Sequence, residues 1–324
     1  MSISPNLRKE GLLLNIEGLN KRIVKPIIGI IVVGLLATVP ILTACNGGTT
    51  APPETMTITP PPETITITLP PETITITPPP ETVTITPTPA TTTTAAAPTT
   101  QLQWLGHAGF LITSSQGTRI LIDPPNAGIG YVIAPIAGVD AVLVTHEHFD
   151  HSNVGLATGS PLILRGLTSS GWNTIDQMVK DVRIYSVSPV NPVYHDDQQG
   201  AQRGRNTIFV LEVDGLRLAH FGDQGHILTP EIIQAMGAVD VVLIPVGGHY
   251  TIDAAEATQV VGQINPLVVI PMHYKTPKMG ADWPGTGVEP FLEGKTVERP
   301  DSTVISLSRP TLPDQTTVVV LNYE

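Results

Sequence analysis

Seven consecutive residues, Thr-His-Glu-His-Phe-Asp-His at 145–151, constrain this chain more than any other feature. They follow Ala-Val-Leu-Val at 141–144, an apolar run typical of a buried strand. One loop therefore offers three imidazoles and a carboxylate at H-x-H-x-D-H spacing. Alternate residues of such a loop can ligate one ion, while Asp150 and His151 can turn toward a second. Imidazole suits zinc and iron, and carboxylates extend the list to manganese; the alternative, a solvated loop that happens to be rich in histidine, fits this spacing poorly.

Cysteine and histidine usage narrows the chemistry further. The only cysteine is Cys45, whereas all nine histidines lie between His107 and His273. A single cysteine excludes a disulfide within the chain, and its position excludes thiolate ligands and a cysteine nucleophile from the C-terminal region. We therefore expect imidazole and carboxylate chemistry.

Residues 1–45 have the pattern of an export signal. Lys21, Arg22 and Lys25 precede an apolar run at 26–44, which ends in Leu-Thr-Ala directly before Cys45. A basic flank, an apolar stretch and small residues at a cleavage site are typical of a secretory signal. The last four residues resemble a bacterial lipobox, which implies cleavage before Cys45 and a lipid on its sulfur. An uncleaved transmembrane anchor is the alternative, and both predict an extracytoplasmic protein attached to a membrane.

Residues 46–100 have the composition of a linker. A nine-residue repeat rich in Pro, Thr and Ile places glutamates at positions 54, 63, 72 and 81. The alternation of Thr and Ile is strand-like, but prolines interrupt every repeat and no second apolar face is present to bury. We therefore predict a disordered, extended spacer with polyproline-like stretches.

Residues 101–324 are predicted to form a single α/β domain. Asp214-Gly215 lies between two apolar runs and indicates a tight hairpin. Thr229 followed by Pro230 indicates the start of a helix. Helices are expected at 172–179, 230–236 and 253–264. Strands interspersed with helices imply an α/β sandwich, and the expected strands lie at 103–105, 109–113, 119–122, 141–145, 162–164, 181–186, 207–213, 216–220, 241–245 and 267–271.

The predicted domain is acidic. The whole chain has a net charge of −11, and residues 101–324 contain 12 basic against 22 acidic side chains. Such a surface repels phosphate backbones, so no nucleic-acid partner is expected. The oligomeric state is not indicated by any of these patterns.

Four separated motifs together resemble the metallo-β-lactamase superfamily across nearly all of residues 101–324. The segment Trp104-Leu-Gly-His-Ala-Gly-Phe-Leu-Ile112, followed by Ile120-Leu-Ile-Asp-Pro124, is similar to the opening of one subgroup, which includes ascorbate-phosphate lactonases and uncharacterised zinc-dependent hydrolases. The 145–151 loop resembles the superfamily signature. Phe221-Gly-Asp-Gln224 and Ile270-Pro-Met-His-Tyr274 resemble its later motifs and occur in the same order.

This resemblance implies a four-layer αββα sandwich with two divalent metal ions at one edge. Zinc is the expected metal, and manganese and iron are the alternatives. The resemblance also implies the ligands. The first ion is expected on His146, His148 and His195, and the second on Asp150, His151 and His273. Asp223 is expected to bridge the two ions. His195 has an alternative interpretation as a surface-loop histidine.

Three further polar residues are expected to support these ligands. His107 and Asp123 are expected to pack against or orient a ligand through hydrogen bonds. His220 lies three residues before Asp223 in a strand-like run, so a structural role is expected for it rather than metal binding.

The expected function is a metal-dependent hydrolase that uses a hydroxide activated by two metal ions. Asp150 is expected to orient the water and accept its proton, and Asp223 to fix the metal spacing. The substrate is expected to be a small molecule with an ester, lactone or phosphoester bond. Arg203 and Arg205 are candidates for binding an anionic group on it, and His249 for lining the pocket. The alternative is a non-catalytic surface lipoprotein that binds a metal or ligand through a degenerate hydrolase domain.

Overall fold

The computed structural model describes residues 96–187 and 192–323, together with the backbone of four short strands earlier in the chain. These are β1 (Thr57–Ile58), β2 (Ile65–Leu69), β3 (Glu72–Ile76) and β4 (Val83–Thr84), which pair antiparallel as β1 with β4 and β2 with β3. The Thr-Ile alternation thus forms strands within the predicted linker. Residues 96–100 of that linker are also described, with Thr100 as the first residue of a strand of the folded domain. The other linker residues, like the predicted signal at 1–45, lie outside the described residues and stay a prediction.

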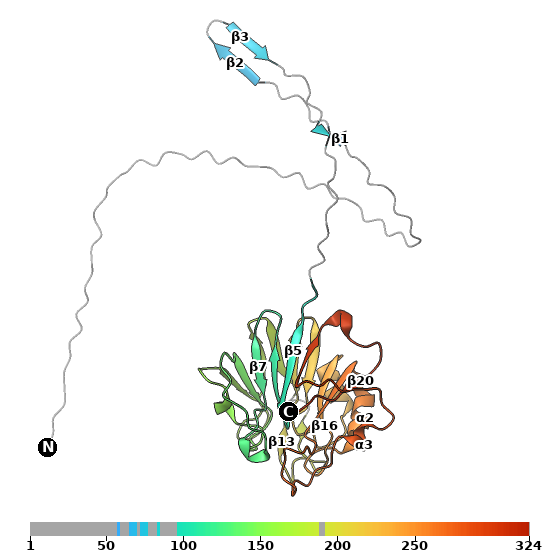
Figure 1. The fold of residues 1–324 in the computed structure, drawn as a ribbon. Coiled ribbons are helices and arrows are strands. Elements are labelled where there is room, and N and C mark those ends of the chain that lie inside the picture. Colours follow the sequence, from blue (N-terminus) through green and yellow to red (C-terminus); the bar gives the residue numbers. More distant parts are fainter. Residues whose placement is uncertain are drawn as a thin grey trace, which may run out of the picture. The chain divides into compact units, whose positions relative to one another are not determined.

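Two large sheets form most of the C-terminal unit, residues 92–324 (Figure 1). The six-stranded sheet has the order β19 (Val304–Leu307), β5 (Thr100–Gly106), β6 (Gly109–Thr113), β7 (Arg119–Ile122), β8 (Ala141–Val144) and β9 (Leu162–Arg165). The eight-stranded sheet has the order β10 (Asp176–Val179), β11 (Val182–Ser186), β14 (Phe209–Val213), β15 (Leu216–His220), β16 (Val241–Pro245), β17 (Val268–Met272), β20 (Thr317–Val319) and β18 (Val297–Glu298).

The main core lies between the two sheets. Alternate side chains of the six-stranded sheet, such as Phe110 and Ile122, pack in one cluster with the eight-stranded sheet. The intervening residues, such as Leu121 and Val142, point to the other face of the same sheet and form a smaller cluster with Leu156. Both faces of these strands are therefore buried, which explains their nearly continuous apolar runs.

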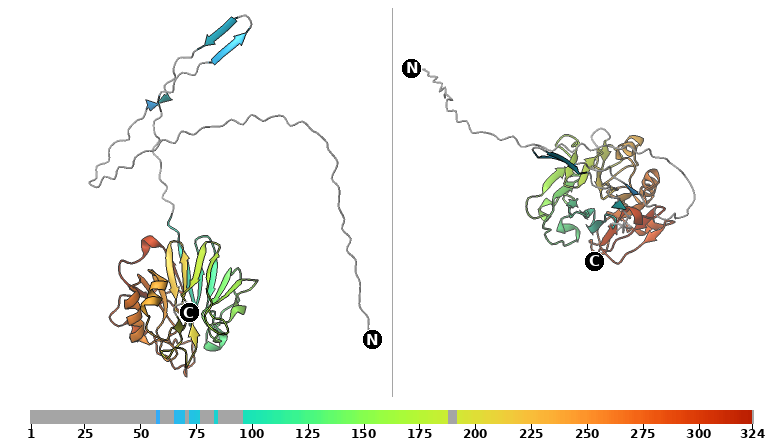
Figure 2. Two further views of the ribbon diagram at one scale, coloured as in Figure 1. Left: turned by 180° about the vertical axis from the view of Figure 1, so that it is seen from behind. Right: turned by 90° about the horizontal axis from the view of Figure 1, so that it is seen from above.

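Two α-helices connect parallel strands of the eight-stranded sheet. α1 (Pro230–Met236) lies between β15 and β16, and α2 (Ala254–Ile264) between β16 and β17. α3 (Glu289–Leu292) contacts α2. In the views from behind and from above, the helices drawn in orange lie on the outer side of the eight-stranded sheet (Figure 2). These crossovers bring the carboxyl ends of β15, β16 and β17 to one edge of the sheet.

Local signals account for several of these elements. The side chain of Thr229 accepts a hydrogen bond from the backbone N–H of Ile232, which confirms the predicted start of α1. Asp214 and Gly215 both have positive φ (51° and 76°) in the hairpin that joins β14 to β15, as its two-residue turn requires. The mixed sheets confirm the predicted α/β sandwich.

The helix predicted at 172–179 is wrong. Residues Asp176–Val179 form β10, which pairs antiparallel with β11 through a turn at Lys180 and Asp181. The preceding indole of Trp172 donates its N–H to the backbone carbonyls of Val193 and Asn206, so this segment is fixed by contacts distant in sequence. Those contacts outweigh a weak local preference for helix.

Three 3₁₀ turns and a further pair of strands complete the described domain. The turns are η1 (Ala127–Ile129), η2 (Val154–Leu156) and η3 (Arg309–Thr311). The strands β12 (Val193–Tyr194) and β13 (Arg205–Asn206) pair antiparallel apart from the two large sheets. Among the described residues no helix is long and apolar enough to cross a membrane, and the predicted span at 26–44 lies outside that search.

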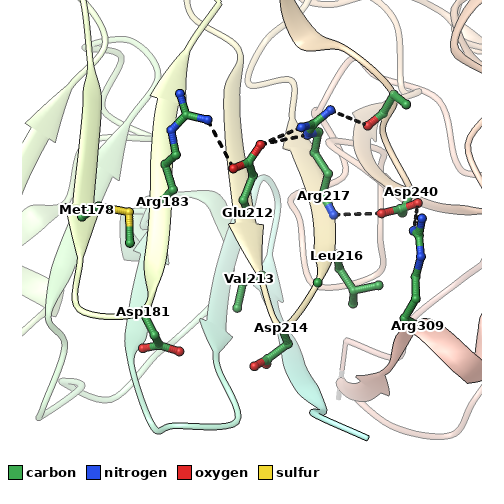
Figure 3. A pocket seen from close by; sticks show the side chains of 12 residues that line it. Met178, Asp181, Arg183, Glu212, Val213, Asp214, Leu216, Arg217, Asp240 and Arg309 are labelled. Carbon is green, nitrogen blue, oxygen red and sulfur yellow. Dashed lines mark hydrogen bonds and ion pairs between the residues drawn. The ribbon is translucent and has the colours of Figure 1, made fainter. Parts of the chain in front are cut away.

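A pocket of about 620 Å³ lies at the amino ends of β15 and β16 (Figure 3). We call it the paired-charge pocket, after seven charged residues in its lining: Asp181, Arg183, Glu212, Asp214, Arg217, Asp240 and Arg309. Glu212 accepts hydrogen bonds from Arg183 and Arg217, and Asp240 accepts from the backbone N–H of Arg217 and from Arg309. The two remaining acids accept from Ser and Thr hydroxyls. Each of these seven charges thus has a partner.

Candidate metal centre

The predicted metal ligands meet at the edge of the domain where several strands end. His146 follows β8 after one residue, and His273 follows β17 directly. Asp223 lies three residues beyond β15, and His195 directly follows β12. Strand ends hold side chains on a rigid scaffold at the mouth of a sandwich. Segments far apart in the sequence therefore form one cluster.

The first group of ligands contains His146, His148, His195 and Asp223. One possible ligand atom from each lies within 4.8 Å of all the others. Nε2 of His195 is 2.8 Å, and Nε2 of His146 is 3.6 Å, from Oδ2 of Asp223. His195 is 2% exposed, so the alternative of a surface histidine does not apply to it. The first predicted set is therefore assembled, with His148 on its exposed side.

The second group contains His107, Asp150, His151 and His273, again within 4.8 Å of one another. Nε2 of His151 and of His273 lie 3.0 and 3.3 Å from Oδ1 of Asp223. The three ligands predicted for a second ion thus come together, and His107 joins them. The carboxylate of Asp223 faces both groups, because Oδ1 is turned to one and Oδ2 to the other.

Buried nitrogen atoms without hydrogen-bond partners mark this cluster. They include Nε2 of His151, His195 and His273, which lie 2.8–3.3 Å from the carboxylate of Asp223 but not in hydrogen-bonding geometry. Oδ1 of Asp223 is equally without a hydrogen bond. Burying such polar atoms unsatisfied costs about 1–3 kcal/mol each. Lone pairs of imidazole and carboxylate that converge in this way fit divalent cations, which would satisfy them. The residues present therefore suit the metal ions that the resemblance implies.

Asp123 supports this cluster from behind, as the sequence predicted. Its buried carboxylate accepts from Nδ1 of His151 at 2.9 Å and from both the backbone N–H and the hydroxyl of Thr145, at 2.8 and 2.6 Å. If Nε2 of His151 gives up its proton when a metal ion binds, the hydrogen bond to Asp123 keeps the remaining proton on Nδ1. Asp123 therefore fixes both the tautomer of His151 and the start of the signature loop.

His107 plays the equivalent part for Asp150. Its Nε2 lies 3.1 Å from Oδ2 of Asp150, and its ring packs on His273 with centroids 4.0 Å apart. Burial lowers the pKa of His107 to about 3, so the ring is neutral and donates its single N–H to the carboxylate. His107 therefore contacts both Asp150 and His273, as predicted, and its role in metal binding stays a prediction.

Burial and neighbouring charge set the ionisation of the other groups. Burial lowers the pKa of His146 well below 6.5, which keeps its imidazole neutral and able to offer a lone pair. Burial opposes ionisation of His151, but Asp223 and Asp123 raise its pKa well above 6.5. Burial also opposes ionisation of Asp223, but the positive charge on His151 lowers the pKa of Asp223 well below the usual range. Asp223 is therefore an anion at the centre of the cluster.

His220 is structural, as expected. Its Nε2 donates to the backbone carbonyl of Ala108 at 2.8 Å, and its Nδ1 accepts from the backbone N–H of Gly222 at 3.1 Å. Both ring nitrogens are occupied, so none is left for a metal ion. Gly222 itself has φ of 51°, and a Cβ there would lie 2.4 Å from Oδ1 of Asn206, so only glycine fits in this turn.

Three residues of the centre have a left-handed backbone. The φ angles are 54° for His107, 43° for Asp123 and 52° for His273. This conformation costs a residue with a Cβ roughly 1–2 kcal/mol. The backbone carbonyl of His107 accepts the N–H of His273 at 3.1 Å and the indole N–H of Trp104 at 3.0 Å, which locks two of these three turns together.

A pocket of about 490 Å³ opens over the cluster. Its lining includes Asp150 and Asp223 from the centre and also Arg203, one of the two arginines predicted to meet an anion. The other, Arg205, stacks over the ring of Trp172 at 5.4 Å and is not part of the lining. His249 is exposed and also outside the lining.

Some residues of the site carry no local signal in the sequence. Asn206 accepts the backbone N–H of Asp223 and donates to the carbonyl of Phe221, so it holds the turn that presents Asp223. Tyr250 and Trp283 line the pocket from two further loops. An asparagine or an aromatic residue in a loop is too common to single out, since its role depends on contacts across the fold.

Comparisons with known proteins agree with this geometry. A domain family described as the β-lactamase superfamily domain matches residues 101–273, which include every predicted metal ligand. A protein from Thermococcus onnurineus named UPF0173 metal-dependent hydrolase is 31% identical over 210 residues, covering 59% of this chain and 88% of its own length. A protein of the same description from Myxococcus xanthus is 38% identical, covering 55% and 71%.

The fold has a counterpart among solved structures as well. A protein from Thermotoga maritima, described as a candidate zinc-dependent hydrolase of the metallo-β-lactamase superfamily, superposes with a TM-score of 0.54 at 30% identity and covers 69% of this chain and 100% of its own. Motif order, ligand geometry and likeness to these proteins all point the same way. The chain therefore belongs to the metallo-β-lactamase superfamily and is one of its metal-dependent hydrolases.

Proposed function

We propose that this hydrolase holds two divalent metal ions. Zinc is the expected metal, and manganese and iron are the alternatives. His146, His148 and His195 would hold one ion, and Asp150, His151 and His273 the other. The observation that carries this proposal is the placement of Asp223, whose two carboxylate oxygens each face one set of buried, unsatisfied imidazole nitrogens. A shared carboxylate between two ligand sets is typical of dinuclear centres.

The bound ions would supply Lewis-acid polarisation of the scissile group and would lower the pKa of water toward neutrality. The chain contributes positioning and proton transfer. Asp150 lines the pocket, and Oδ2 is held by His107, which leaves Oδ1 without a hydrogen bond in the described structure. That oxygen would orient a water molecule and accept its proton. Asp123 keeps the side chain of His151 from rotating, and His107 does the same for Asp150.

The proposed substrate is a small molecule with an ester, lactone or phosphoester bond. A pocket of about 490 Å³ has the size of a small-molecule site. The acidic charge of the chain opposes binding of nucleic acid, and an anionic substrate would have to bind through Arg203 and the metal ions.

We propose further that the protein is exported and held at a membrane, through a lipid on Cys45 or through an uncleaved anchor at 26–44. The basic flank, apolar run and Leu-Thr-Ala-Cys sequence support this location. Intact-mass measurement of protein extracted from membranes separates the two forms. A mass that retains residues 1–44 would rule out the lipoprotein.

Replacement of Asp150 by Asn tests the catalytic role. We expect kcat on the best of a panel of esters, lactones and phosphoesters to fall roughly 100- to 10,000-fold, because a general base is lost. Circular dichroism should show a folded domain, and mass spectrometry should report the metal content of both proteins. Near-normal turnover in Asp150→Asn would refute the assigned role.

Glu147→Gln is the matched control. This glutamate belongs to the same loop, but its carboxylate is exposed and paired with Arg165 outside the pocket. Its turnover should stay within about 2-fold of the wild type, since exposed ion pairs contribute little. A chain with two bound metal ions that hydrolyses nothing in the panel would favour the alternative of a non-catalytic binding protein.

A further inference from the structure

The pocket over the metal centre has an aromatic wall. Phe149, Tyr250 and Trp283 line it, and the rings of Tyr250 and Trp283 meet edge to face with centroids 5.6 Å apart. Phe149 is 61% exposed and Tyr250 is 37% exposed, although both are large apolar side chains. Apolar surface left open at the mouth of a polar site indicates a ligand that covers it.

Arg203 stands on this wall without an acidic partner. Its guanidinium lies over the ring of Tyr250, 5.8 Å from the centroid. Among residues 96–187 and 192–323, five other arginines pair with carboxylates: Arg165, Arg183, Arg217, Arg299 and Arg309. A guanidinium that lines an enzyme pocket and is paired only with an aromatic face remains available for an anion.

The loop that carries Arg203 is organised by a buried acid. Asp196 is 2% exposed, and its carboxylate accepts four backbone N–H groups. Oδ1 accepts from Gln198 and Gly200, and Oδ2 from Gln202 and Arg203, at 2.7–3.0 Å. The residue before Asp196 is the metal ligand proposed above, His195. One carboxylate therefore fixes the position of Arg203 relative to the metal centre.

We propose that the substrate is a small organic anion with a flat apolar group, such as an aryl phosphate, or an aryl ester or lactone that also carries a carboxylate. Arg203 binds the anionic group, and Tyr250 and Trp283 pack on the flat group next to it. This inference deepens the proposed function and rests on it, because it names the substrate class of the same site. Asp196 acts as a positioning residue for Arg203.

Calorimetric titration of the zinc-loaded full chain tests this proposal through binding rather than turnover, and an assay for released phenol shows whether phenyl phosphate is hydrolysed during the titration. The probes are phenyl phosphate and benzoate, which combine both features, inorganic phosphate, which lacks the ring, and phenol, which lacks the charge. We expect phenyl phosphate or benzoate to bind most tightly, and the comparison of the two distinguishes phosphate from carboxylate. Arg203→Ala should weaken that binding about 10-fold or more, as loss of a charge-assisted hydrogen bond predicts.

Arg205→Ala is the matched control, because Arg205 lies two residues away on Trp172 and outside the pocket lining. Its binding should stay within about 2-fold of the wild type. Tyr250→Leu should weaken binding of phenyl phosphate but leave inorganic phosphate unchanged, since only the first has a ring to stack. Asp196→Asn replaces the acceptor for Arg203 and should reproduce the effect of Arg203→Ala, with the metal content measured alongside.

Equal affinities in Arg203→Ala and Arg205→Ala would overturn the proposal, because the metal ions alone would then account for anion binding. Failure of the wild type to bind either phenyl phosphate or benzoate would overturn it too. A third outcome separates the two proposals. If anion binding depends on Arg203 but the chain has no hydrolytic activity, the proposed function is refuted and the inferred anion-binding role of Arg203 stands. The melting temperature of each variant shows whether it has folded.

Discussion

The two ends of β15 and β16 carry pockets of opposite character. At their amino ends, the paired-charge pocket holds seven charged side chains, and each has a hydrogen-bond partner within the protein. Figure 3 shows the hydrogen bonds of Glu212 and Asp240. At the other end, the metal centre buries imidazole nitrogens that have none. The paired-charge pocket is the larger, at about 620 against 490 Å³. Unsatisfied ligand atoms, rather than volume or charge, therefore identify the functional end of this sheet.

The largest effect that separates the two ends should come from metal removal. An ion present at about a thousand times its dissociation constant stabilises a protein by roughly 4 kcal/mol. For a domain of this size that corresponds to a fall of roughly 10 °C in the melting temperature when a chelator removes it. Scanning calorimetry of the full chain before and after chelation, with metal content followed by mass spectrometry, measures this. Identical melting curves would show that the buried nitrogens do not bind metal ions.

A smaller effect on stability is expected from Asp240→Ala in the paired-charge pocket. The substitution leaves the backbone N–H of Arg217 and the guanidinium of Arg309 without their acceptor. The cost should be about 1–3 kcal/mol in the free energy of unfolding by urea, because a hydrogen-bonded acid is lost next to its donors. The metal content should match that of the wild type. A loss of bound metal in this variant would show that the two ends are coupled.

The smallest effect concerns pH and Glu212. The hydrogen bond from Arg217 lowers the pKa of Glu212 below its ordinary value of 4.5. Its contribution is therefore present above about pH 4.5 and is lost as the pH falls through the lowered pKa. Glu212→Gln should cost under about 1 kcal/mol at neutral pH, since the pair is partly exposed, and nothing in acid. Urea unfolding at neutral and acidic pH tests this, and a cost that is constant with pH would contradict it.

Strand positions in the core could be predicted because burial on both faces leaves an unbroken apolar run. β6, β7 and β16 lie where those runs predict them. β10 was missed because only two of its residues, Asp-Gln-Met-Val, are apolar and three of the four are exposed at the edge of a sheet, so no periodicity indicates a strand there. Its strand character comes from pairing with β11, a tertiary interaction.

The candidate site shows the same division. The residues that the structure brings together as candidate ligands, in the compact 145–151 loop and in motifs after strands, could be named from the sequence because their types suit metal binding and their motifs resemble those of the superfamily. Asn206, Tyr250 and Trp283 could not, since their roles arise from positions that only the folded chain brings together. Arg203 and Arg205 look equivalent in the sequence, and only the structure places one of them in the pocket lining.

The left-handed backbone at His107, Asp123 and His273 has a consequence for protein engineering. Glycine would relax the main chain at each of the three positions, yet it would delete a side chain that the centre uses. Selection of the metal-free chain for heat resistance would therefore favour substitutions that remove these side chains. Laboratory evolution of a more robust enzyme should screen turnover and thermal tolerance together, and should seek its gains away from these three turns.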